Sequence, residues 1–315
     1  MQHARNHRRC PVTSVTIVLG YLYPDLMSTH GDRGNVETVR RRCGWRDIEV
    51  AITELRPDDR MPADVDLIMI GGGGESRQRT VAADLYKVKG PAIRDAVAAG
   101  AAALAVGAGF ELFGRFCQPE HGAEYPGIEI FDSWTIRQSA GPCPDYTATS
   151  AASADRHAGE LIVRWGGSLL IGVENHSGGT YLGQAAVPLG RVLAGHGNNG
   201  DGTEGVIAGS AIGTNLRGPC LPKNPALADY LIGAAVARRH PGAELAPLPD
   251  ELEQAARDVA VQQARQAASR RQLTRLLPRP RGPHAQPALS RLRHVQQPPS
   301  QRRPPSRRPS ATGRR

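Results

Sequence analysis

One stretch, residues 101–114, restricts the possible folds of this chain more than any other. It reads AAALAVGAGFELFG: small and β-branched residues lead into Val106, the glycine-rich turn 107–109 follows, and apolar residues then continue at helical spacing. This order predicts a strand, a tight turn and a helix. In α/β enzymes such a turn projects a nucleophile above the sheet, and the N–H groups that begin the helix face the same point. Here the residue at the apex, Gly107, has no side chain.

The residues before this stretch alternate between strand-like and helix-like patterns. Short apolar runs bounded by turn residues predict strands at 14–20, 48–55 and 66–70, and helical spacing predicts helices at 36–45 and 91–99. A polar, glycine-containing segment, 21–35, is predicted to be a loop. A β-α-β-α series of this kind predicts an α/β fold with a mostly parallel sheet.

The pattern changes in the second half of the chain. Alternating runs around Gly166-Gly167 predict a hairpin over 160–174, and a second hairpin is predicted over 206–216. Helical spacing returns at 225–239 and at 249–277. After residue 277 the chain consists largely of Pro, Arg, Ser and Gln without a hydrophobic period, which predicts disorder.

Four consecutive glycines, 71–74, follow the predicted strand 66–70. Glycines at the carboxyl end of a strand allow the backbone to approach a ligand closely, or they permit a tight turn. Because ligands of open α/β sheets bind beyond the carboxyl ends of the strands, we favour the first interpretation.

The charge of the chain is unevenly distributed. The formal net charge is +9 over 315 residues, but residues 269–315 contain 13 Arg and no Lys, Asp or Glu, so the rest carries −4. The tail has no interleaved aromatic residues and is interpreted as a solvated extension, with no specific nucleic-acid partner. Five irregularly spaced cysteines and no long apolar run predict a reduced, cytoplasmic protein without a membrane span.

Five motifs in order carry a resemblance to a known family. They are residues 20–42 (GYLYPDLMSTHGDRGNVETVRRR), 66–73 (DLIMIGGG), 173–182 (VENHSGGTYL), 196–205 (HGNNGDGTEG) and 212–225 (IGTNLRGPCLPKNP). Together they resemble the GatD family, the glutamine amidotransferase subunits of lipid II isoglutaminyl synthase, within the class I, cobyric-acid-synthase-like amidotransferases. The resemblance covers about residues 14–240.

The resemblance implies a fold and a domain organisation. The expected fold is α/β, a single flavodoxin-like class I glutamine amidotransferase domain with a mostly parallel sheet. We expect a disordered N-terminus (1–13), this domain (14–240), a helical extension (241–277) and a disordered Pro/Arg-rich tail (278–315).

The family's chemistry needs a cysteine thiolate to attack the glutamine carboxamide and a histidine to move the proton. The family turn reads Cys-Gly-Gly-Tyr-Gln, and these positions are 107–111 here; Gly107 stands at the nucleophile position. The family motif Gly-Thr-x-Leu-His-Gly-Pro aligns with 213–219, where Arg217 replaces the histidine. A guanidinium cannot act as a base near neutral pH, so glutaminase activity is expected to be lost. The resemblance assigns substrate binding to Arg156, Gly72, Gly73 and Ala108.

In the GatD family, ammonia from glutamine passes to a MurT-like subunit of the Mur-ligase family, which uses ATP to amidate D-glutamate in the peptidoglycan stem peptide. The resemblance therefore implies a heterodimer with such a ligase, with glutamine as the family substrate and with no cofactor or metal. The main alternative is a non-catalytic scaffolding or regulatory subunit. A dinucleotide-binding protein is disfavoured because Leu112 stands at the third glycine position of the fingerprint.

Other residues were weighed as functional candidates. His176 and His196 lie in glycine-rich loops, where histidines more often make structural hydrogen bonds than bind ligands. Cys43 and Cys220 are interpreted as small buried residues because neither lies at the apex of the turn.

Overall fold

The computed structural model describes residues 15–137 and 157–276. The predictions for 1–13, 278–315 and Arg156 therefore fall outside the described residues. The chain divides into two units, Met1–Thr274 and Arg275–Arg315. The architecture described below is that of the first unit.

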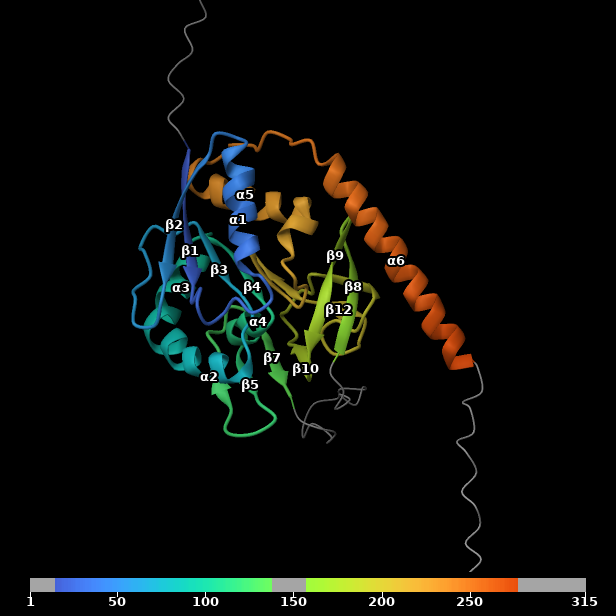
Figure 1. The fold of residues 1–315 in the computed structure, drawn as a ribbon. Helices are drawn as coiled ribbons and strands as arrows, with labels where there is room; N and C mark the ends of the chain where they lie inside the picture. The colour runs from blue at the N-terminus through green and yellow to red at the C-terminus, as the bar shows by residue number, and fades with distance from the viewer. Residues whose placement is uncertain (1–14, 138–156, 277–315) are drawn as a thin grey trace, which may run out of the picture. The chain divides into compact units, whose positions relative to one another are not determined.

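The largest sheet, sheet A, has six strands in the order β13-β14-β4-β3-β1-β2 (Figure 1). The strands are β1 (Thr16–Leu22), β2 (Glu49–Leu55), β3 (Leu67–Ile70), β4 (Ala102–Val106), β13 (Val206–Ala208) and β14 (Ala211–Thr214). Five of them run parallel, and β13 pairs antiparallel with β14 at one edge. The predicted α/β fold with a mostly parallel sheet is confirmed.

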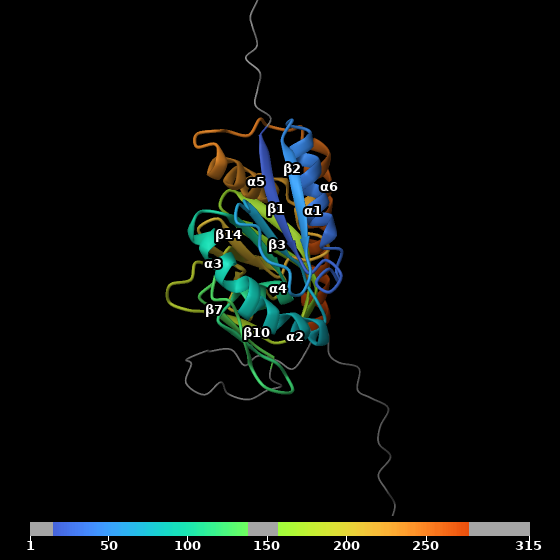
Figure 2. The same ribbon diagram turned by 90° about the vertical axis from the view of Figure 1, so that its left-hand side faces the viewer.

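Helices cover both faces of sheet A, as a sheet with two apolar faces requires. On one face lie α1 (Arg33–Gly44) and α5 (Pro225–Arg239). On the other lie α2 (Glu75–Asp84), a π-helical turn η1 (Leu85–Lys89), α3 (Gly90–Ala98) and α4 (Ala108–Phe113). Figure 2 shows α1 and α3 on opposite sides of the strands.

The side chains of β4 show how one strand serves both cores. Ala102, Leu104 and Val106 contribute to the core beneath α1 and α5, and Ala103 and Ala105 contribute to the core beneath α2 and α3. All five are at most 1% exposed. This alternation follows from the two-residue period of a strand and explains why the sequence here is apolar without interruption.

Within residues 15–137 and 157–276, two four-stranded sheets lie outside sheet A, and only part of them was predicted from the sequence. Sheet B has the order β10-β7-β5-β6, with β5 (Phe116–Gln118), β6 (Tyr125–Pro126), β7 (Ser133–Ile136) and β10 (Gly179–Leu182). Sheet C has the order β12-β11-β8-β9, with β8 (His157–Trp165), β9 (Ser168–His176), β11 (Gly190–Ala194) and β12 (Thr203–Glu204). The hairpins predicted around 166–167 and over 206–216 are confirmed as β8-β9 and β13-β14.

The long helix α6 (Glu251–Leu276) is preceded by the short turn η2 (Leu221–Lys223) and by α5. Val261 and Ala264 of α6 pack against Ile162 and Ile171 of sheet C. The helix predicted over 249–277 therefore packs on the domain through its first half. No helix among the described residues is long and apolar enough to cross a membrane.

Two sequence expectations were incomplete. The helical segment α2-η1 was not predicted, because it buries only a few side chains, one of which is the polar Gln78, and so shows no apolar stripe. The predicted loop 21–35 is shorter than expected. Tyr21 and Leu22 are buried in β1, and α1 already begins at Arg33.

Candidate functional site

The carboxyl ends of β1, β3, β4 and β14 meet at one edge of sheet A, because these neighbouring strands run parallel. The residues that follow three of these strands are the ones to which the sequence assigned a site. Gly72 and Gly73 follow β3, Gly107 and Ala108 follow β4, and Arg217 lies three residues after β14. The structure thus brings these five residues to one edge, while their functional roles stay predictions.

Gly107 lies between β4 and α4, as predicted, in a backbone conformation that side chains rarely adopt. Its φ is 56° and its ψ is −115°. Its N–H donates to the carbonyl of Thr214 at 2.8 Å, and its carbonyl accepts from the N–H of Glu111 at 3.0 Å. A sharp turn of this kind holds the nucleophile in α/β hydrolases. In this chain the turn is formed, but Gly107 has no side chain that could act as the nucleophile.

The side chain of Arg217 fills the space above this turn. A Cβ placed on Gly107 would lie 2.6 Å from both Cζ and Nη2 of Arg217. Arg217 is 7% exposed, and its backbone is fixed by a bridge to Val173 of β9, with N–O distances of 2.9 and 3.2 Å. A permanently protonated guanidinium therefore lies over the turn at Gly107.

The glycines after β3 allow a close approach, but to the chain's own loop. The N–H of Gly72 donates to Oδ2 of Asp32 at 2.9 Å, and its carbonyl accepts from the N–H of Thr29 at 2.9 Å. A Cβ on Gly71 would lie 2.5 Å from Cγ of Asp32, and one on Gly73 would lie 2.6 Å from Sδ of Met27. The packing of the loop before α1 is thus sufficient to explain why glycine occupies positions 71 and 73.

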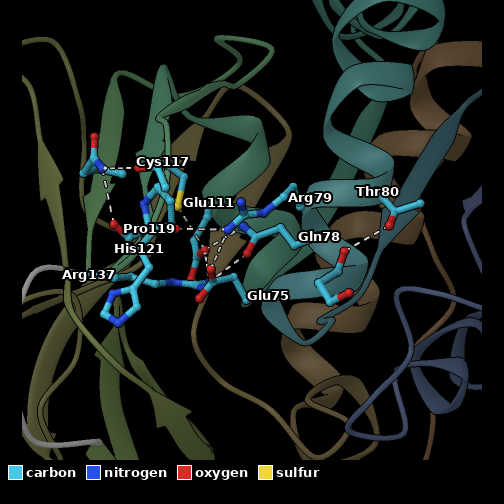
Figure 3. A network of polar contacts seen from close by, with 12 residues as sticks. Glu75, Gln78, Arg79, Thr80, Glu111, Cys117, Pro119, His121 and Arg137 are labelled. Carbon is cyan, nitrogen blue, oxygen red and sulfur yellow. Dashed lines mark hydrogen bonds and ion pairs between the residues drawn. The ribbon is translucent and has the colours of Figure 1, made fainter. Parts of the chain in front are cut away.

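A buried polar network holds the short helix that follows the turn (Figure 3). Glu111 of α4 is 4% exposed and forms an ion pair with Arg137. Gln78 of α2 donates to Oε2 of Glu111 at 2.7 Å and to the carbonyl of Ala108 at 3.3 Å, and it accepts from Arg137 at 2.8 Å. The sequence analysis did not identify this network. A glutamate inside an apolar helix was the available signal, because a buried carboxylate requires a partner.

The two histidine candidates belong to one cluster, together with His157. The rings of His157 and His196 stack at 3.4 Å with an interplanar angle of 6°, and the ring of His176 lies 5.6 Å from that of His157. Glu174 accepts from the N–H groups of His196 and Gly197 at 2.7 and 3.0 Å. Burial, followed by the neighbouring His157, lowers the pKa of His196.

The histidine cluster is not arranged as a metal site. Parallel stacked imidazoles do not direct their nitrogens at one point, and no group of three His, Cys, Asp or Glu side chains in residues 15–137 and 157–276 could hold a metal ion.

None of the described cysteines replaces the missing nucleophile. Cys43, Cys117 and Cys220 are buried, and burial raises the pKa of each thiol, in Cys43 to about 12. The reactive form of cysteine is the thiolate, so these thiols are unreactive near neutral pH. Cys10 and Cys143 lie outside the described residues.

The sequence of the chain is similar to those of known proteins. The sequence profile of the CobB/CobQ-like glutamine amidotransferase domain matches residues 18–225. The chain is 29% identical over 258 residues to "Lipid II isoglutaminyl synthase (glutamine-hydrolyzing) subunit GatD" of Staphylococcus aureus (strain N315), which covers 81% of this chain and 99% of that protein. It is 28% identical over 228 residues to the subunit of the same name from Streptococcus pneumoniae (strain ATCC BAA-255 / R6), covering 70% of this chain and 81% of that protein.

Solved structures were compared as well. PurLQS from Thermotoga maritima matches at 15% identity with a TM-score of 0.38, covering 70% of this chain and 95% of that chain. The glutaminase domain of Trypanosoma brucei CTPS with bound acivicin matches at 11% identity with a TM-score of 0.43, covering 70% and 94%.

Proposed function

Because the chain belongs to the CobB/CobQ-like glutamine amidotransferase domain family, we propose that it is a GatD-like subunit of a lipid II isoglutaminyl synthase that no longer hydrolyses glutamine. The sequence relationship to two GatD subunits supports the first half of this proposal. One observation supports the second half: Gly107 offers no side chain at the turn, and the guanidinium of Arg217 occupies the space above it.

Glutamine hydrolysis of this class requires two groups that this pair does not provide. A thiolate sulfur forms a bond to the carboxamide carbon, and a base first accepts the thiol proton and then gives a proton to the departing ammonia. Gly107 has no atom that could form the acyl bond. Arg217 keeps its proton at all ordinary pH values and so cannot accept one.

The remaining structure favours a binding role over a decayed remnant. The turn at Gly107 has a sharp conformation of the kind that holds a nucleophile in α/β hydrolases, and the network of Gln78, Glu111 and Arg137 fixes the helix behind it. In the proposed role the chain binds a MurT-like subunit of the Mur-ligase family in the cytoplasm. That ligase uses ATP to amidate the D-glutamate of the stem peptide, and it takes free ammonium as the nitrogen source. Glutamine could then be bound but not hydrolysed. The residues that would bind it are Gly72, Gly73, Ala108 and Arg156.

The nitrogen source of the complex tests this function. The full chain is co-expressed with the Mur-ligase-like partner from the same genome, and amidation of lipid II is measured with ATP and either glutamine or ammonium chloride. We expect product with ammonium chloride and only background with glutamine. Glutamine-dependent amidation at a rate comparable to the ammonium reaction would overturn the proposal.

A further inference from the structure

Two histidines that the proposed chemistry leaves unused lie with their rings in face-to-face contact. His157 is the first residue of β8, and His196 belongs to the loop of residues 195–202, which joins β11 to β12. The two rings are nearly parallel, with centroids 3.4 Å apart and an interplanar angle of 6°. The contact therefore connects the start of β8 to a loop that comes much later in the chain.

The loop packs closely around the ring of His196. Glu174 of β9 is 4% exposed, and its two carboxylate oxygens accept the N–H groups of His196 and Gly197 at 2.7 and 3.0 Å. A Cβ on Gly200 would lie 2.8 Å from Cε1 of His196. The backbone of the loop is thus fixed to β9, and the imidazole is in contact with both its own loop and His157.

The stability of this contact depends on the charge of the two rings. Histidine is the side chain whose ordinary change of protonation falls between about pH 5 and pH 8. Two neutral imidazoles in contact attract each other as other aromatic rings do, whereas two imidazolium ions at 3.4 Å repel each other. Burial, followed by the neighbouring His157, lowers the pKa of His196, so the folded arrangement disfavours its protonated form.

Other titratable groups also face His196. Glu174 of β9 and Asp201 of the loop act against the lowering of its pKa, and His176 of β9 adds to it. The ring centroids of His176 and His196 are 6.3 Å apart, and Nε2 of His176 is 3.5 Å from Oε2 of Glu174. Glu204 of β12 is fully buried and interacts with both His176 and Glu174 through its charge. These carboxylates are therefore further candidates for any pH dependence of the loop.

We propose that the stacked rings of His157 and His196 form a pH-sensitive latch. The latch keeps the loop of residues 195–202 against β8 while the rings are neutral and releases it when both are protonated. Released rings take up protons at about pH 6.5, the ordinary pKa of histidine, but the closed latch resists the second proton. The latch is therefore closed above about pH 6.5 and opens progressively below it. It involves neither Gly107 nor Arg217, so it can be tested without glutamine or a ligase.

Amide hydrogen exchange in the full chain measures the opening of the latch. The amides of the loop residues His196, Gly197 and Asn198 all donate hydrogen bonds. Their protection factors, corrected for the intrinsic exchange rate, should fall at least about tenfold between about pH 7.5 and about pH 5. The amide of Ile171, which donates to Asn224 at 2.8 Å outside the loop, is the internal reference and should not show this fall. Equal behaviour of the loop amides and the reference would overturn the proposal.

A matched variant separates the latch from the nearby carboxylates. His157→Phe combined with His196→Phe keeps two stacked aromatic rings and removes both titrating groups. We expect the loop amides of this variant to keep the same protection at both pH values. A fall equal to that of the unmodified protein would overturn the proposal and assign the pH dependence to Glu174, Asp201 or Glu204. If the double variant does not fold, His157→Phe alone is measured. Its fall should be at least about threefold smaller, because only one stacked ring can take up a proton, and an equal fall would again overturn the proposal.

The titration of the rings gives a second readout, which a purely structural contact would not change. The ring protons of His157 and His196 are followed by NMR and identified with the two single Phe variants. We expect the pair to titrate in two steps separated by more than about 1 pH unit. In His157→Phe, His196 should titrate in a single step and at a higher pH, because one cause of its lowered pKa is absent. A pair that titrates in one step, with a His196 titration that His157→Phe leaves unchanged, would contradict the proposal.

Discussion

The guanidinium of Arg217 occupies the space that a side chain at Gly107 would need: a Cβ on Gly107 would lie 2.6 Å from the Cζ of Arg217. The residues at positions 107 and 217 are therefore sterically linked. A side chain at position 107 would require the guanidinium of Arg217 to move. One buried cation thus occupies the space above the turn.

The first prediction concerns Gly107→Ala. We expect a loss of about 1–3 kcal/mol of unfolding free energy, because alanine is strained at a φ of 56° and its Cβ would displace the guanidinium. Gly209→Ala is the matched control, since Gly209 has a φ of 57° and open space around it. Urea unfolding should show a larger loss at position 107, and Arg217→Ala should reduce that loss. An equal loss in the presence and absence of Arg217 would refute the steric link.

The second prediction concerns the stability of the helical face that carries α1 and α5. Arg42 is 3% exposed in its side chain and binds Asp229 and Asp250, each at 2.7 Å. Arg42→Met should destabilise the fold by about 3–5 kcal/mol, because Asp250 loses its ion pair and Asp229 keeps only the one with Arg46. Arg40→Met, which breaks an exposed pair with Glu37, should change stability by less than about 1 kcal/mol. Chemical denaturation of the two variants checks this, and similar losses would contradict it.

The third prediction is a pH dependence that arises from Asp229. Burial raises the pKa of this carboxyl, but the ion pairs with Arg42 and Arg46 lower it more, so the folded pKa lies below its usual value. Its contribution to stability is therefore present above the unfolded pKa of about 3.9 and is lost as the pH falls through the folded pKa. The stability difference between the unmodified protein and Asp229→Asn should stay constant from about pH 5 to 7 and shrink below about pH 4. A stability difference between the two proteins that grows as the pH falls would contradict this prediction.

The parts of the fold that depend on local sequence could be predicted. The apolar run into Val106 and the glycines after it predicted β4, the turn and α4, because strand and turn preferences act over a few residues. The Gly-Gly pair at 166–167 predicted the β8-β9 hairpin for the same reason. The helical segment α2-η1 was missed because its buried face includes two polar side chains, Gln78, which binds Glu111, and Lys89, which pairs with Asp84 of α2 itself.

The arrangement of the site depends on contacts between distant residues, so the sequence did not reveal it. Arg217 could be aligned with a lost histidine, but only the fold shows that its side chain lies over Gly107. Asp32 reaches Gly72 across 40 positions, and Glu111 reaches Arg137 across 26. His157 was not predicted to belong to the histidine cluster. It does so because the β8-β9 register places it opposite His176.

The fourth prediction concerns the partner. The full chain should co-purify with a MurT-like ligase, and deletion of residues 278–315 should leave the association intact, because that segment has no apolar anchors. Affinity purification of a tagged ligase with each form of the chain tests both statements. Failure of the full-length pair to associate would count against the proposed function, and loss on deletion would assign the contact to the tail.

The last prediction concerns restoration of the chemistry. Gly107→Cys alone should recover little glutaminase activity, because a thiol without a base is mostly protonated at neutral pH. Gly107→Cys combined with Arg217→His should recover the most. Gly107→Ser with Arg217→His is the control, since it supplies similar bulk without a thiol. Equal activity in the cysteine and serine combinations would show that the turn no longer supports the reaction.

The proposed loss of glutaminase activity can be tested directly on the unmodified protein. The rate of glutamine hydrolysis is measured as glutamate release in the presence of the ligase partner. Removal of the nucleophile from a hydrolase of this kind costs about 10⁶-fold in turnover, and loss of the second member adds little. With Gly107 and Arg217 in place, we expect a rate equal to that of the ligase alone. Sustained glutamate release above that background, abolished by a substitution in this chain, would contradict it.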